Sequence, residues 1–210
     1  MCIFCAEIDQ PDIVKSVFGS YFRHKHRIIY ADDNILAIPG YGPQVYPYIL
    51  VLTKRHIPSF LGASKNEKES YFHFFDVLLK SSVYHSDSLC IFEHGGEENG
   101  GCSSITHCHV HVIEGDLGFY NYIDWEDRQQ KISISPQDEY KAPQNYLLIA
   151  EYREGKMTAK INTSPVNVHQ YFRKCLSEIV DCEEWDWRTG INNELWIPKL
   201  IDECKKQLVY

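Results

Sequence analysis

Three histidines alternate with small or apolar residues in the segment His107-Cys108-His109-Val110-His111. Successive side chains of a β-strand point to opposite faces, so this spacing predicts that the three imidazoles share one face of a strand over residues 107–113. A single histidine in a strand is more often a hydrogen-bonded structural residue. Three in strict alternation after a glycine-rich loop favour a metal site or a catalytic site.

Metal binding is the first of these two uses. The pair Cys2-x-x-Cys5 has zinc-type spacing, but it supplies only half of a tetrahedral site. His56 follows a long apolar run and His107 begins the histidine strand, so the two could complete the site if their strands lie side by side. The alternative is that Cys2 and Cys5 are buried thiols without a metal.

Nucleophilic catalysis is the second use. A neutral imidazole attacks phosphorus well near neutral pH, because its unperturbed pKa is about 6.5. Attack divides one difficult displacement into two steps through a phosphohistidine-type intermediate. The glycine-rich loop at 94–106 could direct backbone N–H groups, including that of Gly101, and the hydroxyls of Ser103 and Ser104 at the phosphate oxygens.

The elements that must position these residues follow from local patterns. An apolar run at 48–52 predicts a central strand buried on both faces, and a capping box from Ser64 to Glu67 predicts the start of a helix over 66–81. Further strands are expected at 27–30, 34–38 and 89–93, a loop at 116–143, a hairpin from strands 145–152 and 157–161, and helices at 168–179 and 193–208. We expect a catalytic unit at 1–115 and a C-terminal extension at 116–210.

Composition narrows the class of partner. The 210 residues carry a net charge of −8, which suits a small phosphorylated substrate better than a nucleic acid. We expect the short basic cluster at 23–27 to be solvated. No apolar run approaches the length of a membrane span and the N-terminus does not look like a signal peptide, so the sequence predicts a cytoplasmic protein with no membrane partner. The eight cysteines then favour metal binding over disulfides.

Together, the Cys pair, Lys54-Arg55-His56, Ser104 and the alternating histidines resemble the histidine triad superfamily over residues 2–114. The resemblance implies an α+β fold, with an antiparallel sheet and flanking helices, that usually forms a homodimer. It implies a structural zinc on Cys2, Cys5, His56 and His107. It also implies that His109 is the nucleophile that becomes nucleotidylated, and that His111 lies near the phosphate and the leaving group.

Two departures from the family pattern concern substrate recognition. Many members carry an Asp for the ribose hydroxyls where this chain has Gly40, and a Gln where it has Ser103. His94 stands where many members have an Asn-rich stretch. It either replaces an Asn near the substrate or is a loop histidine in solvent.

The C-terminal part resembles the tail of some longer bacterial members through residues 170–173 and 185–188. Gln170 and Arg173 are expected to share a helix face, with Arg173 directed away from the apolar stripe and towards the far end of a larger substrate. The alternative is a plain surface helix. We expect Trp185 and Trp187 to be packing anchors.

The sequence therefore predicts a nucleotide hydrolase that cleaves a dinucleoside polyphosphate, a phosphoramidate or a nucleotide sugar at the α-phosphate, because a third histidine in the triad tends to mean hydrolysis in this family. A nucleotidyltransferase or phosphorylase with the same intermediate, and a non-catalytic zinc-stapled nucleotide-binding module, are the alternatives.

Overall fold

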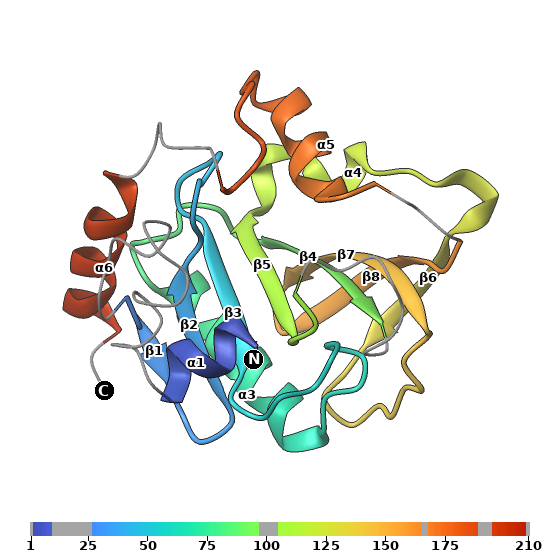
Figure 1. Ribbon diagram of the computed structural model, residues 1–210, viewed down its shortest axis with the longest axis horizontal. Helices are drawn as coiled ribbons and strands as arrows, with labels where there is room; N and C mark the ends of the chain where they lie inside the picture. The colour runs from blue at the N-terminus through green and yellow to red at the C-terminus, as the bar shows by residue number, and fades with distance from the viewer. Residues whose placement is uncertain (1, 10–26, 97–104, 165–167, 189–194, 209–210) are drawn as a thin grey trace.

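A computed structural model of the protein describes residues 2–9, 27–96, 105–164, 168–188 and 195–208. Its centre is one antiparallel sheet of eight strands in the order β1-β2-β3-β5-β4-β7-β8-β6 (Figure 1). The strands are β1 (Tyr30–Ala31), β2 (Ile35–Pro39), β3 (Ile49–Thr53), β4 (Leu89–Gly96), β5 (His109–Glu114), β6 (Gln130–Ile134), β7 (Asn145–Arg153) and β8 (Lys156–Asn162).

Helices flank both faces of this sheet. They are α1 (Ile3–Asp9), α3 (Lys65–Lys80), α4 (Phe119–Tyr122), α5 (Tyr171–Ile179) and α6 (Trp196–Gln207), with short 3-10 turns η2 (Gly115–Leu117) and η3 (Glu126–Arg128). The α+β fold expected from the sequence is confirmed. None of the helices in the described ranges is long and apolar enough to cross a membrane.

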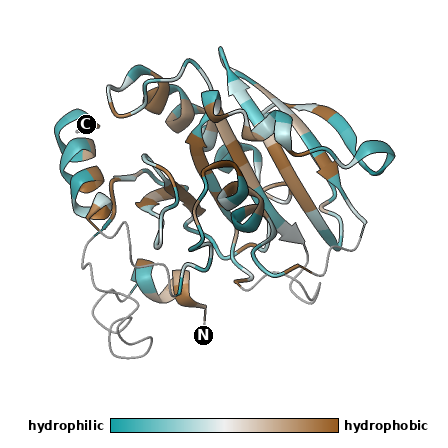
Figure 2. Cartoon of the chain, turned by 90° about the horizontal axis from the view of Figure 1, so that it is seen from above, coloured by the Kyte–Doolittle hydropathy of each residue, from teal (hydrophilic) through white to brown (hydrophobic). Residues whose placement is uncertain are grey.

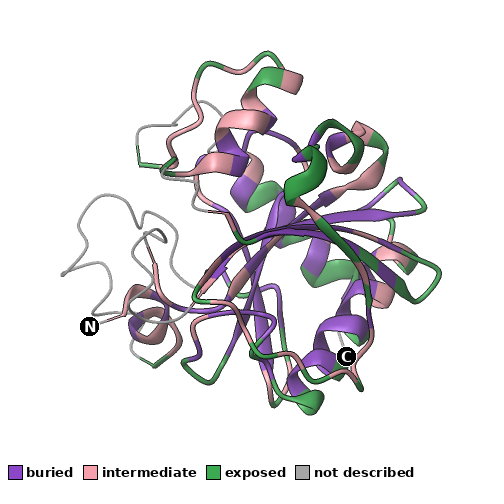
Figure 3. Ribbon diagram, turned by 90° about the vertical axis from the view of Figure 1, so that its right-hand side faces the viewer, coloured by how far each residue is buried: buried purple, intermediate pink, exposed green. Residues whose placement is uncertain are grey.

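Two hydrophobic clusters hold the layers together, one on each face of the sheet. The helices α3 and α6 contribute buried residues to the first cluster, whereas α1, α4 and α5 contribute to the second. Cys108, Val110 and Val112 belong to the first cluster and leave His109 and His111 on the face of the second. The strands are buried throughout the middle of the sheet, and hydrophobic residues concentrate there (Figures 2 and 3).

The central strand is the one that the apolar run predicts. All five residues of β3 are buried, and β3 lies between β2 and β5. The capping box is also present: the Ser64 hydroxyl accepts from the Glu67 amide at 3.3 Å, and the Glu67 carboxylate accepts from the Ser64 amide at 2.7 Å. The helix α3 therefore begins at the predicted place.

The structure differs from the sequence expectations at several ends and in one whole strand. β4 continues to Gly96 and so includes His94, which the sequence placed in a loop. Residues 130–134, also expected to be loop, form the edge strand β6 on β8. Only Ile134 of this strand is buried, so its sequence lacks a strong apolar pattern.

Strands on both sides of residue 115 belong to the same sheet. β4 pairs with β7 over its whole length, from Leu89 opposite Tyr152 to Gly96 opposite Asn145. The strands β6, β7 and β8 therefore extend the sheet that β1 to β5 begin. The division into units at 1–115 and 116–210 stays a prediction.

Candidate functional site

A cluster of two thiols and two imidazoles lies where α1 meets the ends of β3 and β5. The Cys5 Sγ atom is 3.2 Å from His56 Nδ1 and 3.4 Å from His107 Nδ1, and these two nitrogens are 3.2 Å apart. Cys2 Sγ is 3.5 Å from His107 Nδ1. The four ligand atoms all lie within 4.8 Å of one another, so Cys2, Cys5, His56 and His107 could hold a metal ion.

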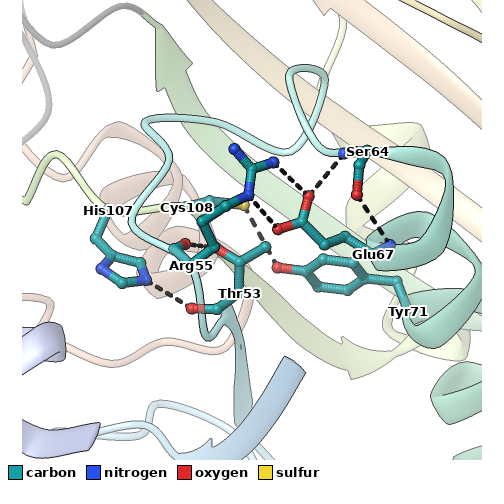
Figure 4. Close-up of polar contacts among 7 residues, drawn as sticks. All are labelled: Thr53, Arg55, Ser64, Glu67, Tyr71, His107 and Cys108. Atoms are coloured by element: carbon teal, nitrogen blue, oxygen red, sulfur yellow. Dashed lines mark hydrogen bonds and ion pairs between the residues drawn. The ribbon is translucent and has the colours of Figure 1, made fainter. Parts of the chain in front are cut away.

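The spacing suits a tetrahedral centre. Metal–ligand distances of about 2.0–2.3 Å place the ligand atoms of a tetrahedron about 3.3–3.8 Å apart, which is close to the four separations of 3.2–3.5 Å given above. The other ring nitrogen of His107 donates to the Thr53 carbonyl at 2.7 Å, as Figure 4 shows. That bond fixes the ring and directs Nδ1 at the cluster, where a bound metal would take the place of any proton.

The sheet explains why these four residues meet. β3 and β5 are antiparallel neighbours, with Leu52 opposite His109, so the residues that follow β3 lie beside those that precede β5. Burial alone would raise the pKa of the Cys2 thiol, but hydrogen bonding and the charge of His107 lower it to about 6. Burial and the neighbouring Cys2 raise the pKa of Cys5 to about 11. A metal that binds both thiolates therefore displaces a proton from Cys5.

His109 lies next along the strand, and its protonation pattern is set by the backbone. Its Nδ1 is 2.7 Å from the carbonyl oxygen of His107, which can only accept, so Nδ1 carries the proton and Nε2 keeps its lone pair. Burial lowers the pKa of His109 to about 4, which leaves the ring neutral at pH 7. The ring of Phe4 covers it at a centroid distance of 5.1 Å.

His111 is held by two aromatic residues. Its Nδ1 is 2.7 Å from the Tyr48 hydroxyl, and its ring stacks on Phe92 at a centroid distance of 4.8 Å with 3° between the planes. Burial, together with His109 and Arg173, lowers the pKa of His111 well below its usual value. Two neutral imidazoles therefore stand side by side, with ring centroids 5.3 Å apart.

Both imidazoles line a pocket with an empty volume of about 890 Å³, which includes the open solvent at its mouth. Elements distant in sequence form its walls: α1, the segment after β2, strands β3 to β5, and α5. Most of the lining is apolar or aromatic, including Ile3, Phe4, Leu50, Phe92, Phe172 and Trp187.

The structure places only some of the predicted substrate-binding residues at the pocket. His94 lines the pocket from β4, and its Nε2 bonds to the Asn145 side chain at 2.9 Å, so it is not a loop histidine in solvent. Gln170 and Arg173 also line the pocket. Gly101, Ser103 and Ser104 lie outside the described residues.

The expectation that Gln170 and Arg173 share a helix face is wrong. Gln170 precedes α5 with a left-handed backbone (φ 53°), and its amide donates to Asp186 at 3.0 Å. Arg173 is not directed outward either, because its side chain is buried and donates to the Tyr48 hydroxyl at 3.3 Å. Its Nε–H donates to the Trp185 carbonyl, so Trp185 contributes a backbone contact at this site.

Sequence reasoning missed two residues of the site. Arg27, placed in a solvated segment, is only 2 % exposed, pairs with both carboxylate oxygens of Glu7 at 2.6 and 2.8 Å, and lines the pocket. Tyr48 was taken only as part of a strand. A Cβ atom at Gly40 would lie 2.5 Å from the Tyr48 ring, so this ring occupies the space that a side chain at position 40 would need.

The comparisons with known proteins begin with the sequence. Residues 22–117 match the family model of the HIT domain. No curated protein matches the chain.

Several solved structures are similar. A hypothetical histidine triad nucleotide-binding protein from Sulfolobus tokodaii is 15 % identical, with 91 % of this chain and 98 % of that chain covered and a TM-score of 0.39. A DUF4931 family protein from Bacillus cereus is 13 % identical, covers 73 % and 98 %, and has a TM-score of 0.43. A Zn-bound histidine triad family protein from Mycobacterium smegmatis is 20 % identical, covers 54 % and 73 %, and has a TM-score of 0.37.

Proposed function

We propose that this chain, whose residues 22–117 match the family model of the histidine triad (HIT) domain, is a nucleotide hydrolase in which His109 forms a covalent nucleotidyl intermediate. The observation that carries the proposal is the hydrogen bond from His109 Nδ1 to the His107 carbonyl oxygen at 2.7 Å. This bond leaves the lone pair on Nε2 of a neutral ring at the wall of the pocket. A nucleophile needs such a lone pair.

The first chemical step forms one bond and breaks one. The Nε2 lone pair of His109 attacks the α-phosphorus, and the leaving group departs with the electron pair of its bond to phosphorus. The ring then carries a positive charge, which the hydrogen bond from Nδ1–H to the His107 carbonyl stabilises.

The second step restores the enzyme. Water attacks the same phosphorus, the P–N electron pair returns to Nε2, and the water proton is released to solvent. The product is a nucleoside monophosphate. Binding of the phosphate oxygens is assigned to His111 and to the loop residues Gly101, Ser103 and Ser104.

His94, Gln170 and Arg173 are assigned to the remainder of the substrate, because all three line the same pocket. Three of the five N–H donors of Arg173 already bind Tyr48, Gly42 and Trp185, so a substrate contact would use the others. The segment from β2 to β3 offers Gly40 and the Tyr48 ring where a ribose-binding carboxylate would stand in many family members.

The metal is assigned as zinc. Two thiolates and two imidazole nitrogens at tetrahedral spacing are a zinc donor set, and all four positions are filled by the chain. The ion would therefore stabilise the fold rather than meet the substrate. It would do so by tying α1, and with it the pocket residue Phe4, to the histidine strand.

The test is intact-mass spectrometry under neutral conditions after brief mixing with dinucleoside polyphosphates, nucleoside phosphoramidates and nucleotide sugars. We expect a nucleotide-sized adduct or released mononucleotide from the wild type and from His85→Ala, an exposed histidine on the loop before β4. His109→Ala should give neither.

Other outcomes would change the assignment. Transfer of the nucleotide to added inorganic phosphate would make the protein a phosphorylase. Normal nucleotide binding by His109→Ala, with no turnover by the wild type on any member of the panel, would favour a binding module.

A further inference from the structure

A buried chain of polar groups leads from α5 to the last histidine of the triad. The Arg173 guanidinium donates to the Tyr48 hydroxyl at 3.3 Å, and that hydroxyl lies 2.7 Å from Nδ1 of His111. Arg173 is 5 % exposed and Tyr48 is 2 % exposed. The three linked side chains lie along the wall of the pocket, and the two hydrogen bonds join residues 125 and 63 positions apart in the sequence.

The direction of each hydrogen bond follows from counting protons. A guanidinium can only donate, so the Tyr48 oxygen must accept from Arg173. A phenol has a single proton, and burial raises the pKa of Tyr48, which keeps that proton in place. Among the described residues, the Tyr48 hydroxyl has one remaining partner, His111 Nδ1, so its proton points there.

We propose that Tyr48 and Arg173 are positioning residues that hold His111 in the tautomer with a bare Nδ1 and a protonated Nε2. If His111 carried the proton on Nδ1 instead, the Tyr48 proton would have no acceptor among the described residues. An unsatisfied buried hydroxyl is costly, so the arrangement strongly favours the proposed tautomer.

Further contacts hold this series of linked side chains rigid. The other two donating nitrogens of Arg173 bind the carbonyl oxygens of Gly42 and Trp185, so the guanidinium is fixed from three sides. The His111 ring is also fixed, because it stacks on Phe92. Neither the Arg173 guanidinium nor the His111 ring can rotate without breaking buried contacts.

The consequence for catalysis rests on the proposed function. His111 is neutral and protonated on Nε2, so it can donate a hydrogen bond to a phosphate oxygen beside the phosphorus that His109 attacks. The two neighbouring imidazoles would then have opposite tautomers, with His109 as the nucleophile and His111 as the hydrogen-bond donor.

The proposal is tested on the whole protein, with metal bound and without substrate, by long-range ¹H–¹⁵N spectra of histidine-labelled samples. His111→Gln identifies the resonances of His111. We expect the wild type to show a pyrrole-type Nε2 and an imine-type Nδ1 whose shift is displaced by a hydrogen bond. Tyr48→Phe should move the Nδ1 shift towards that of a free imine nitrogen.

Two further variants separate this role from general damage. Tyr84→Phe removes another buried hydroxyl, which donates to the Val112 carbonyl of the same strand at 3.2 Å, and should leave the His111 shifts unchanged. Arg173→Met leaves the Tyr48 oxygen without its donor and frees the carbonyls of Gly42 and Trp185 as acceptors for the Tyr48 proton, so the second tautomer should be populated. Arg173→Lys should restore the first.

Activity provides a second measurement. Tyr48→Phe should lower kcat about tenfold and change KM less than about twofold. The reason is that His111, no longer held with its proton on Nε2, loses its hydrogen bond to the phosphate at the transition state. A protonated Nδ1 in the wild type, or an Nδ1 shift that Tyr48→Phe and Tyr84→Phe affect equally, would overturn the proposal. The spectra need no turnover, so a failure of the proposed hydrolase function would be seen separately.

Discussion

Replacing Gly40 by alanine should disturb the pocket through one atom. Gly40 follows β2, and its amide donates to the Tyr48 carbonyl at 3.1 Å. An added Cβ would lie 2.5 Å from Cδ1 and 2.7 Å from Cε1 of the Tyr48 ring, which is closer than real Cβ contacts come. The ring must therefore shift, and its hydroxyl is then drawn away from His111.

The expected cost is a sum of opposing terms. Overpacking a buried position costs about 1–3 kcal/mol, and a weakened hydrogen bond adds about 1 kcal/mol. Alanine also lowers the conformational entropy of the unfolded chain, which stabilises the folded protein by about 0.4–1 kcal/mol. We therefore expect Gly40→Ala to lower the free energy of unfolding by about 1–3 kcal/mol, measured by urea denaturation.

The matched control is Gly62→Ala. There the added Cβ would lie 3.4 Å from the Ser59 hydroxyl and 3.8 Å from the Ala142 side chain, which are ordinary contacts. We expect a change within about 0.5 kcal/mol.

A double-mutant cycle tests the cause. Tyr48→Ala removes the ring, so Gly40→Ala should cost less than about 0.5 kcal/mol in that background. The reasoning is refuted if Gly40→Ala is neutral in the wild type, or if its cost is the same with and without the ring.

Three further perturbations test the surroundings of the pocket. Cys2→Ser with Cys5→Ser removes two of the four proposed metal ligands, so elemental analysis should show loss of metal and calorimetry a lower unfolding temperature. Ser64→Ala removes the cap of α3 and should lower the free energy of unfolding by about 1 kcal/mol in urea denaturation. Burial raises the pKa of Glu93 to about 7, so the wild type should lose up to about 3 kcal/mol of stability from about pH 5 to about pH 8, and Glu93→Gln should not.

The sign of the Glu93 effect follows from proton binding. Between the ordinary pKa of 4.5 and about 7 the folded state holds a proton that the unfolded state has released. Stability is therefore full below about pH 4.5 and declines as the pH rises through 7. An equal pH dependence in Glu93→Gln would show that another group causes it.

Controls for the other two variants are available in the chain. Cys182→Ser replaces a thiol whose Sγ lies 3.8 Å from the Glu184 carbonyl, and it should keep the metal. Full metal content in the double serine variant would contradict the proposed ligand set. The Glu67 carboxylate also binds Arg55 at 2.7 and 3.0 Å, so an undiminished helix in Ser64→Ala would mean that this pair alone defines its start (Figure 4).

Short-range patterns predicted the parts of the structure that short-range physics determines. The apolar run of β3, the capping box of α3 and the turn between β7 and β8 each depend on residues within a few positions. The metal cluster also followed from sequence, because His56 comes soon after β3 and His107 comes just before its antiparallel neighbour β5, which brings the two flanks together. Strand β6 was missed because pairing with β8, rather than its own pattern, makes it a strand.

Residues whose environment comes from distant segments could not be predicted. Arg27 looked solvated within a basic cluster, yet the carboxylate of Glu7 and the carbonyl of Pro39 enclose it. Arg173 looked exposed by helical spacing, but Tyr48 and the Gly42 carbonyl provide buried acceptors. A charged side chain can be buried wherever the fold supplies hydrogen-bond or ion-pair partners, and helical periodicity contains no information on those partners.

The two imidazoles at the pocket obtain their protonation patterns from different neighbours. His109 donates from Nδ1 to the carbonyl of His107, a proposed metal ligand beside the N-terminal helix α1. His111 accepts at Nδ1 from Tyr48, which Arg173 of helix α5 orients. An acceptor beside one ring and a donor beside the next produce a lone pair at one Nε2 and a proton at the other. Damage at α1 and damage at α5 should therefore alter different imidazoles. Loss of the metal should affect His109, and loss of Arg173 should affect His111.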